Sequence, residues 1–219
     1  MSRGMKLVVL VGCLLAACDD GSLRAFEPRV LALGGAGGAG GMTSAPEAGK
    51  STAPSLPLLI DDFEDGDPRA KEPLGWWYPV NDGKGTQGFG IEPASLAPTG
   101  VYALRTHGSG FHDWGAAVGV DLLGNAGPLD LRSGHELCFI ARIEAASSTS
   151  MQVHLLSAAQ HYIRDVSLSE TWTRYCLALT DFRSLNQEAL VPTQLIALQY
   201  FFPPTEPFAF WLDDVEVMP

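Results

Sequence analysis

The sequence is poor in basic residues. Its 219 residues include 14 Lys and Arg against 25 Asp and Glu, which gives a formal net charge of −11 at pH 7. Nucleic acids and anionic surfaces are recognised through clustered positive charge, so nucleic acid is not an expected partner. Neutral ligands, cations and basic proteins remain compatible with this composition. An acidic surface can also serve only to keep an exported domain soluble.

A long hydrophobic run is also missing. The main apolar stretch begins at Leu7 and has about eleven residues, too few to cross a hydrocarbon layer ~30 Å thick. Arg3 and Lys6 precede this stretch, and small residues follow it up to Cys18. A basic start, a short apolar run and small residues are typical of a signal peptide, so we expect residues 1–17 to be cleaved on export.

Residues Leu15-Ala16-Ala17-Cys18 resemble the lipobox of bacterial lipoproteins. The resemblance implies that the Cys18 thiol is diacylated and becomes the new N-terminus after cleavage. Several acyl chains, each contributing ~0.8 kcal/mol per buried methylene, hold a protein on a membrane. We therefore expect an exported protein, anchored by lipid at the cell envelope or cell surface, on the periplasmic or extracellular side. A plain secretory signal that happens to carry Cys18 is the alternative.

Residues 18–57 lack any pattern that could bury one face. Glycine and alanine dominate from Gly34 to Gly41, and Ser, Thr, Pro, Ala and Glu follow through Pro57. This composition cannot offset an ordering entropy of about 1–2 kcal/mol per residue, so a flexible tether is expected. A phosphate-binding glycine loop is disfavoured, because no strand precedes the glycines and no Lys-Ser pair closes the run.

Helical periodicity is missing from Leu58 onward. Apolar residues there alternate in short runs, separated by turn sequences such as Asp82-Gly83, and only residues 181–190 read as a short helical or irregular connection. Five Trp, ten Phe and five Tyr in the chain are enough for a packed core. Residues 58–219 are therefore predicted to form an all-β domain, a jelly-roll β-sandwich.

Cysteine is scarce in this predicted domain, where only Cys138 and Cys176 occur. Alternation places both on outer faces and points their apolar neighbours inward: Leu137, Phe139, Ala141, Ile143, Tyr175, Leu177 and Leu179. Because an exported domain folds in an oxidising compartment, we expect the two cysteines to form a disulfide. Two buried free thiols are the alternative.

Polar side chains follow the same alternation. It points these apolar residues inward: Met151, Val153, Leu155, Ile196, Leu198 and Tyr200. If the strands lie side by side, one outer face gathers Arg142, Gln152, His154, Arg174 and Gln199. Such hydrogen-bonding groups on a rigid sheet can satisfy the hydroxyl groups of a sugar. An ordinary solvated sheet face produces the same pattern.

Several motifs between residues 58 and 217 point to one family. They are Asp61-Asp62-Phe63-Glu64-Asp65-Gly66, Trp76-Trp77-Tyr78, Asn81-Asp82-Gly83, Gly110-Phe111-His112-Asp113-Trp114-Gly115-Ala116, Trp172 and Phe210-Trp211-Leu212-Asp213-Asp214-Val215. Together they resemble the galactose-binding-like jelly roll of carbohydrate-binding modules, family 11 in particular. The resemblance implies a non-catalytic module that binds a β-glucan or a related polysaccharide.

The resemblance also implies which residues bind. Aromatic rings that stack on sugars have candidates in Trp76, Trp77, Tyr78, Trp114 and Tyr162, and we expect Trp77 and Tyr78 to contact the ligand. Adjacent aromatic residues alternate on a strand, so at least one of Trp76 and Trp77 is expected in the core. In such modules the first and last strands often hold a structural Ca²⁺, and the matching positions are Asp62, Glu64, Asp213 and Asp214. Separately solvated acids at strand ends are the alternative.

A catalytic motif is not evident. The sequence has no Gly-x-Ser-x-Gly, and the spacing of His107, His112 and His135 matches no zinc site. Glu64 and Asp213 could be read as a glycosidase pair, but both belong to motifs that the fold explains. We therefore expect a membrane-tethered saccharide-binding module and not an enzyme. The alternative is a structural or assembly lipoprotein that binds a protein partner in the envelope.

Overall fold

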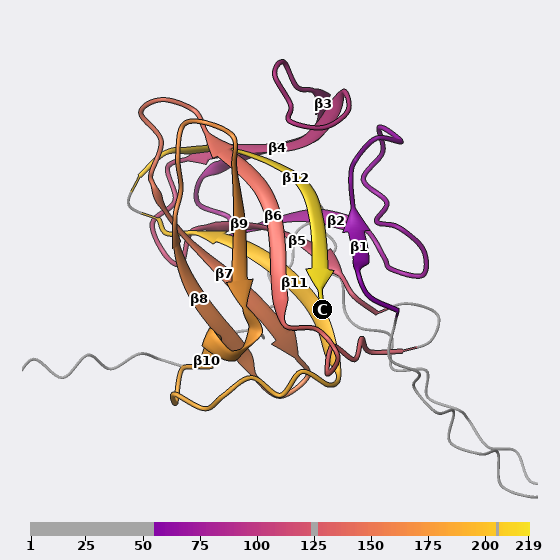
Figure 1. Cartoon of the computed structure of the whole chain (residues 1–219). Helices are drawn as coiled ribbons and strands as arrows, with labels where there is room; N and C mark the ends of the chain where they lie inside the picture. Colours follow the sequence, from indigo (N-terminus) through magenta and orange to yellow (C-terminus); the bar gives the residue numbers. More distant parts are fainter. Residues whose placement is uncertain (1–54, 124–126, 205) are drawn as a thin grey trace, which may run out of the picture. The chain divides into compact units, whose positions relative to one another are not determined.

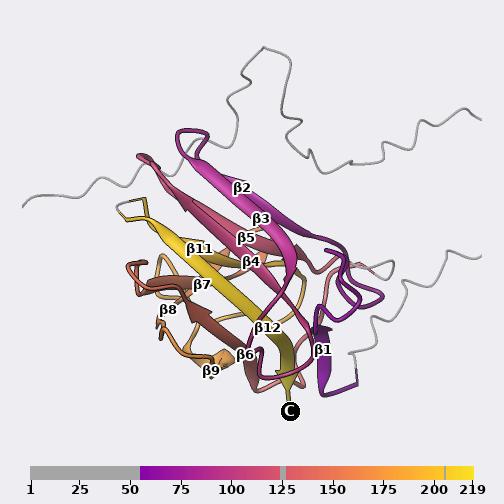
Figure 2. The ribbon, with the colours of Figure 1, turned by 90° about the horizontal axis from the view of Figure 1, so that it is seen from above.

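The computed structural model describes residues 55–123, 127–204 and 206–219, and these residues form two antiparallel β-sheets (Figures 1 and 2). In sheet 1 the strand order is β3-β4-β12-β6-β9, and β1 also pairs with β12. Its strands are β1 (Leu58–Asp61), β3 (Thr86–Pro93), β4 (Tyr102–Ser109), β6 (Glu136–Ile143), β9 (Thr173–Ala178) and β12 (Phe208–Met218).

Sheet 2 has the order β10-β8-β7-β11-β5-β2. Its strands are β2 (Trp77–Asn81), β5 (Ala116–Asp121), β7 (Ser150–Ser157), β8 (His161–Ser167), β10 (Arg183–Ser184) and β11 (Leu195–Phe202). One short 3-10 turn, η1 (Leu179–Asp181), precedes β10, in the region where the sequence indicates a short helical or irregular connection. The predicted all-β jelly-roll sandwich is therefore confirmed.

The core lies between the two sheets and follows the two-residue alternation. Leu137, Phe139 and Ala141 of β6 pack there against side chains of sheet 2 such as Leu198 and Tyr200. The expectation for Ile196 is wrong. A register shift between Leu195 and Ala197 turns Leu195 into the core and leaves Ile196 only partly buried. Such bulges change which residues face inward, and alternation alone does not show them.

Both ends of the domain meet in sheet 1. Strand β1 pairs with the end of β12, with Leu58 opposite Val217 and Asp61 next to Val215. The buried Asp61 carboxylate accepts hydrogen bonds from the Phe63 backbone N–H at 2.9 Å and from the Trp77 indole N–H at 2.8 Å. This acid therefore holds the first strand of sheet 1 against the first strand of sheet 2.

The predicted disulfide between Cys138 and Cys176 is confirmed. The two residues lie directly opposite each other on β6 and β9, and their Cα atoms are 4.1 Å apart. The bond therefore closes the edge of sheet 1 at β9.

In the described part of the chain, no helix has the length and apolar character needed to span a membrane. The predicted signal peptide, Cys18 and most of the predicted tether fall on residues 1–54, outside the described residues.

Candidate functional site

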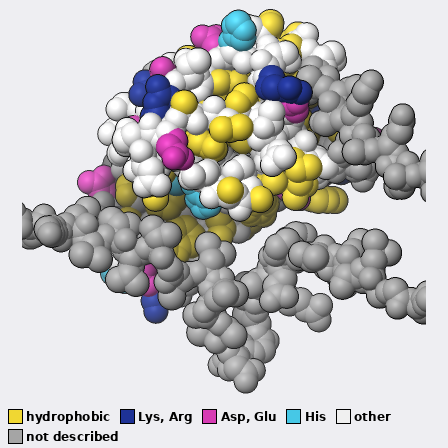
Figure 3. All heavy atoms as spheres, turned by 90° about the horizontal axis from the view of Figure 1, so that it is seen from below, with side chains coloured by type: hydrophobic (Ala, Val, Ile, Leu, Met, Phe, Trp, Pro, Cys, Tyr) yellow, Lys and Arg dark blue, Asp and Glu magenta, His cyan; other side chains and the backbone are white. Residues whose placement is uncertain are grey.

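The outer face of sheet 2 combines polar and aromatic side chains. One row crosses the sheet through paired positions Tyr78, Gly119, Gln199 and His154. The neighbouring row pairs Phe201 with Gln152 and Gln152 with Asp165. We call this surface the polar–aromatic face, made of Tyr78, Trp114, Gln152, His154, Asp165, Gln199 and Phe201. Figure 3 views the domain from below and shows hydrophobic side chains among polar ones with scattered charges.

Three rings stack in sequence on this face. The centroids of Trp114 and Phe201 are 6.0 Å apart with an interplanar angle of 22°, and those of Phe201 and His154 are 5.2 Å apart at 17°. Trp114 is 41% exposed. The nearly parallel rings form an apolar stack, partly exposed at the surface, beside hydrogen-bonding groups. Phe201 is not among the residues expected from the sequence to bind, although it lies two residues after Gln199 and therefore has the same outward orientation.

Gly119 of β5 has no side chain, so the side chains of Tyr78 and Gln199 meet above it. Gln199 donates a hydrogen bond from its Nε2 to the Tyr78 hydroxyl at 3.3 Å. A Cβ atom at Gly119 would lie 2.8 Å from Cγ of Gln199 and 3.2 Å from Cζ of Tyr78, so only glycine leaves this space open. Burial raises the pKa of Tyr78, so its hydroxyl stays protonated and can donate to a ligand.

His154 is a neutral member of the face. Burial, and to a smaller extent the nearby His161, lowers the pKa of His154 to about 4. Its Nε2 lies 3.2 Å from Oε1 of Gln152, and Nε2 of Gln152 donates to Asp165 at 2.8 Å. This chain of hydrogen bonds fixes the ring against Phe201. At pH 7 the polar–aromatic face therefore carries one formal charge, on Asp165.

The loop that carries Trp114 is held by the turn after β2. Oδ2 of Asp82 accepts hydrogen bonds from the backbone N–H groups of His112 at 3.0 Å and Asp113 at 2.9 Å. Gly115, which follows Trp114, has φ of +105°, and a Cβ atom on this residue would collide with the carbonyl oxygen of Phe202. The Asn81-Asp82-Gly83 and Asp113-Trp114-Gly115 motifs thus act together to position the indole.

The prediction that Trp77 contacts a ligand must be corrected. Trp77 is 3% exposed, and its indole N–H is bound to Asp61 in the core. Tyr78 faces outward, as alternation requires, and Trp76 is 56% exposed. Tyr162 is also buried, at 3% exposure.

The predicted gathering of five polar side chains must be corrected too. Gln152, His154 and Gln199 do share one face, but β6 and β9 belong to sheet 1, so Arg142 and Arg174 lie on the other side of the sandwich. The Arg142 guanidinium is 5.3 Å and 5.2 Å from the rings of Trp172 and Trp211, and Arg174 pairs with Glu216 at 2.6 Å.

The predicted metal ligands separate into two groups. Asp62 pairs with Lys71 at 2.7 Å. Glu64 accepts hydrogen bonds from the backbone of Val101 and Tyr102, while Asp213 and Asp214 share the Thr99 hydroxyl at 3.1 and 2.9 Å. Burial, together with the nearby charges of Asp214 and Glu64, raises the pKa of Asp213 to about 7.

A hydroxyl proton can serve only one of these two carboxylates at a time, so uncompensated negative charge remains at this edge. That charge and the oxygen donors fit Ca²⁺. The oxygens of Glu64, Asp213 and Asp214 do not all lie within 4.8 Å of one another, so an ion would have to draw them together. The described residues place Glu136 that close to Cys138 and Cys176, but these cysteines are joined in the disulfide.

No protein-family profile matches the sequence, and no curated protein does. Solved structures do. A family 11 carbohydrate-binding module of a cellulosomal cellulase of Clostridium thermocellum has a TM-score of 0.55 and 11% identity over 77% of this chain and 96% of the module. A family 30 carbohydrate-binding module has a TM-score of 0.54 and 15% identity over 74% of this chain and 87% of its own.

An exo-β-agarase is similar over part of its length, with a TM-score of 0.55 and 10% identity over 74% of this chain and 25% of the agarase. Identities this low establish similarity of fold and nothing finer. The described domain therefore has the jelly-roll β-sandwich fold of these carbohydrate-binding modules.

Proposed function

We propose that this protein is a non-catalytic module that binds a poly- or oligosaccharide on the polar–aromatic face. The observation that carries the proposal is the Trp114, Phe201 and His154 stack beside the Tyr78–Gln199 pair. The fold supports it as well, because a similar structure, with a TM-score of 0.53 and 12% identity, is a family 11 module in complex with a β-1,3-1,4-mixed-linked tetrasaccharide.

The chemistry of the face suits a neutral sugar chain. The apolar C–H face of a sugar ring can pack on Phe201 and Trp114, while hydroxyl groups bond to the amide of Gln199 and the hydroxyl of Tyr78. Gln152 and the neutral His154 extend this set along the sheet. Because the rings and amides are held by contacts within the protein, little side-chain entropy is lost on binding.

Affinity electrophoresis of the full-length protein in gels containing mixed-linkage β-glucan tests the proposal. We expect the gel to retard the wild type. Phe201→Ala should be retarded less, with an affinity about tenfold lower, because the central ring of the stack is lost. Arg174→Ala is the matched control, since Arg174 lies on the other sheet, and it should migrate like the wild type. If Phe201→Ala is retained as strongly as the wild type, the assigned face is wrong.

A protein partner is the alternative outcome of this experiment. A panel of soluble glucan, xylan and agar polysaccharides without any retardation would contradict saccharide binding. Crosslinking of the same full-length protein to one envelope protein would then favour a structural or assembly lipoprotein.

We also propose that Cys18 is acylated and anchors the module to a membrane outside the cytoplasm. The support is the lipobox-like Leu15-Ala16-Ala17-Cys18 sequence after a short apolar run. Metabolic labelling with a radioactive fatty acid should mark the wild type and not Cys18→Ser. Membrane fractionation that retains unlabelled Cys18→Ser as fully as the wild type would contradict the anchor.

A structural Ca²⁺ completes the proposal. Glu64, Asp213 and Asp214 would hold it, and the ion would neutralise their repulsion and tie the beginning of the domain to β12. Asp62 is left out of this set because Lys71 already neutralises it.

A further inference from the structure

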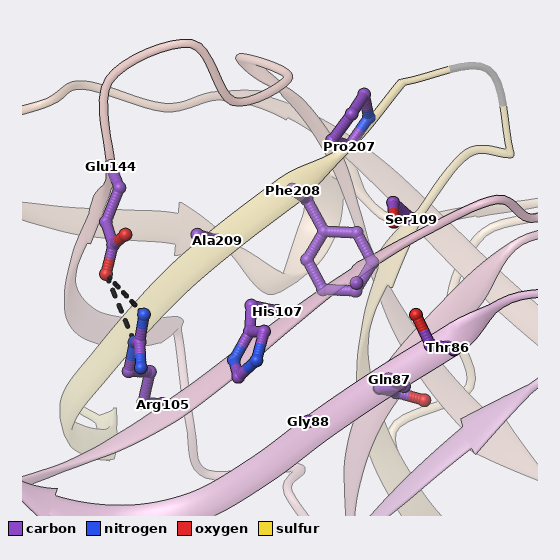
Figure 4. Close-up of a pocket in the computed structure, with 11 residues that line it drawn as sticks. Thr86, Gln87, Gly88, Arg105, His107, Ser109, Glu144, Pro207, Phe208 and Ala209 are labelled. Atoms are coloured by element: carbon purple, nitrogen blue, oxygen red, sulfur yellow. Dashed lines mark hydrogen bonds and ion pairs between the residues drawn. The ribbon is translucent and has the colours of Figure 1, made fainter.

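A groove of about 400 Å³ lies on the outer face of sheet 1, across the sandwich from the polar–aromatic face (Figure 4). It runs over β3, β4 and β12, and its lining includes Gly88, Arg105, His107, Glu144 and Ala209. Pockets of about 300–1,000 Å³ are typical of small-molecule sites. The volume therefore suffices for a ligand of a few rings.

The floor of the groove is made by residues with little or no side chain. Gly88 lies opposite His107 in the sheet, and His107 lies opposite Ala209. The imidazole of His107 occupies the space above Gly88, because a Cβ at Gly88 would collide with the ring. Figure 4 shows the ring between Arg105 and Phe208. His107 is exposed, so the ring offers a free edge and face to the groove.

One wall of the groove is a carboxylate with a spare acceptor. Oε1 of Glu144 receives the indole N–H of Trp211 at 2.9 Å and Nε of Arg105 at 3.1 Å. These bonds hold the pKa of Glu144 below its usual range, with Trp211 the larger cause, so the group is ionised at neutral pH. Within the described residues, Oε2 of Glu144 and both ring nitrogens of His107 have no hydrogen-bond partner. These atoms belong to residues that line the groove, so they are available to a ligand there.

Two arginines balance the two glutamates of this wall. Arg105 contacts Glu144 at 3.0 Å and Glu92 at 3.5 Å, and the charge of Arg142 also acts on Glu144. Both guanidinium groups lie over the ring of Trp211, at 5.3 Å and 5.2 Å. A charged ligand would therefore meet an ion pair instead of a free opposite charge. A neutral ligand with adjacent hydroxyl groups matches the donors and acceptors that remain.

We infer that this groove is a second binding site, for a neutral saccharide segment whose hydroxyl groups bond to Glu144 and His107 while its ring packs over Ala209. This inference goes beyond the proposed function, because it concerns the opposite sheet. A module with a site on each sheet can hold two glycan chains, or two parts of one chain, at once. Such bivalent engagement increases avidity on a polysaccharide surface without stronger individual contacts.

Two histidines allow the sites to be read separately by NMR. The imidazole resonances of His107 report on the groove, and those of His154 report on the polar–aromatic face. The full-length protein is titrated with the β-1,3-1,4-mixed-linked tetrasaccharide, cellotetraose and an agar tetrasaccharide. We expect saturable shifts at both histidines, with different midpoints.

Two variants separate the responses. Ala209→Leu fills the groove floor and should weaken the His107 response at least about tenfold while His154 still responds. Gln199→Ala should have the reverse effect. An unchanged melting temperature shows that each variant folds like the wild type.

Each outcome decides one of the two sites. If His107 does not respond to any of the three sugars while His154 does, the second site is overturned and the proposed function stands. If only His107 responds, the groove stands and the polar–aromatic face fails. Silence at both histidines overturns both, and a His107 response that is unchanged in Ala209→Leu overturns the groove as the location.

Discussion

Removal of the Cys138–Cys176 disulfide should destabilise the domain strongly. The two cysteines are 38 positions apart in the chain, so the bond restricts a long loop in the unfolded state. The loop-closure relation gives about 4 kcal/mol for a loop of this length. For a domain of this size, each kcal/mol corresponds to about 2–4 °C, so the melting temperature should fall by about 8–16 °C.

The Cys138→Ala/Cys176→Ala double variant tests this magnitude by calorimetry and urea unfolding. Cys138 is 1% exposed but lies outside the main core between the sheets, so the lost packing is small compared with the loop-closure effect. Wild type treated with reductant should unfold like the double variant, whereas the double variant should not respond to reductant. A double variant within about 1 kcal/mol of the oxidised wild type would refute the loop-closure reasoning.

Three further predictions concern protons and calcium. Burial raises the pKa of Asp61 from 3.8 to about 6, so the folded state binds the Asp61 proton more tightly than the unfolded state does. This proton therefore adds about 3 kcal/mol to the free energy of unfolding below pH 3.8, and this stabilisation is lost as pH rises through 6. Urea unfolding from pH 4 to 7 should show this slope, and Asp61→Asn should flatten it. Ca²⁺ at a hundredfold excess over its Kd should stabilise the folded state by about 2.7 kcal/mol and so raise the melting temperature. The wild type and Asp62→Asn should show this rise, and Asp213→Asn should not. An unchanged melting temperature of the wild type with Ca²⁺ and with chelator would contradict the site. Because the pKa of His154 is about 4, glucan binding on the polar–aromatic face should be constant from pH 5.5 to 8. Calorimetry on Ala209→Leu, in which the groove beside His107 is filled, measures this face alone, and a loss near pH 6.5 would contradict a buried, neutral His154 ring.

Alternation identified inward and outward side chains well but not their sheet. It placed Phe139 inward and Gln152 outward as observed, yet it also grouped Arg142 with Gln152. The chain crosses from sheet 1 to sheet 2 between β6 and β7 and returns between β8 and β9. A period of two contains no information on such crossings, because each strand alternates in the same way in either sheet.

The aromatic residues show a second limit of the sequence. All three residues of Trp76-Trp77-Tyr78 are aromatic, so the sequence does not show which of them point inward. The hydrogen bond from Trp77 to the buried Asp61 shows that the Trp77 ring is in the core. Phe201 has the same outward phase as Gln199, but the run from Leu195 to Phe202 is almost wholly apolar. In such a run the chemistry of an outward aromatic residue does not distinguish it from a core residue.

A crystal structure of the full-length protein with the β-1,3-1,4-mixed-linked tetrasaccharide would show whether the polar–aromatic face binds sugar. We expect sugar rings over Phe201 and Trp114, with hydroxyl groups within hydrogen-bond distance of Tyr78 and Gln199. A tetrasaccharide bound only away from sheet 2, with the Trp114, Phe201 and His154 rings left uncovered, would contradict it.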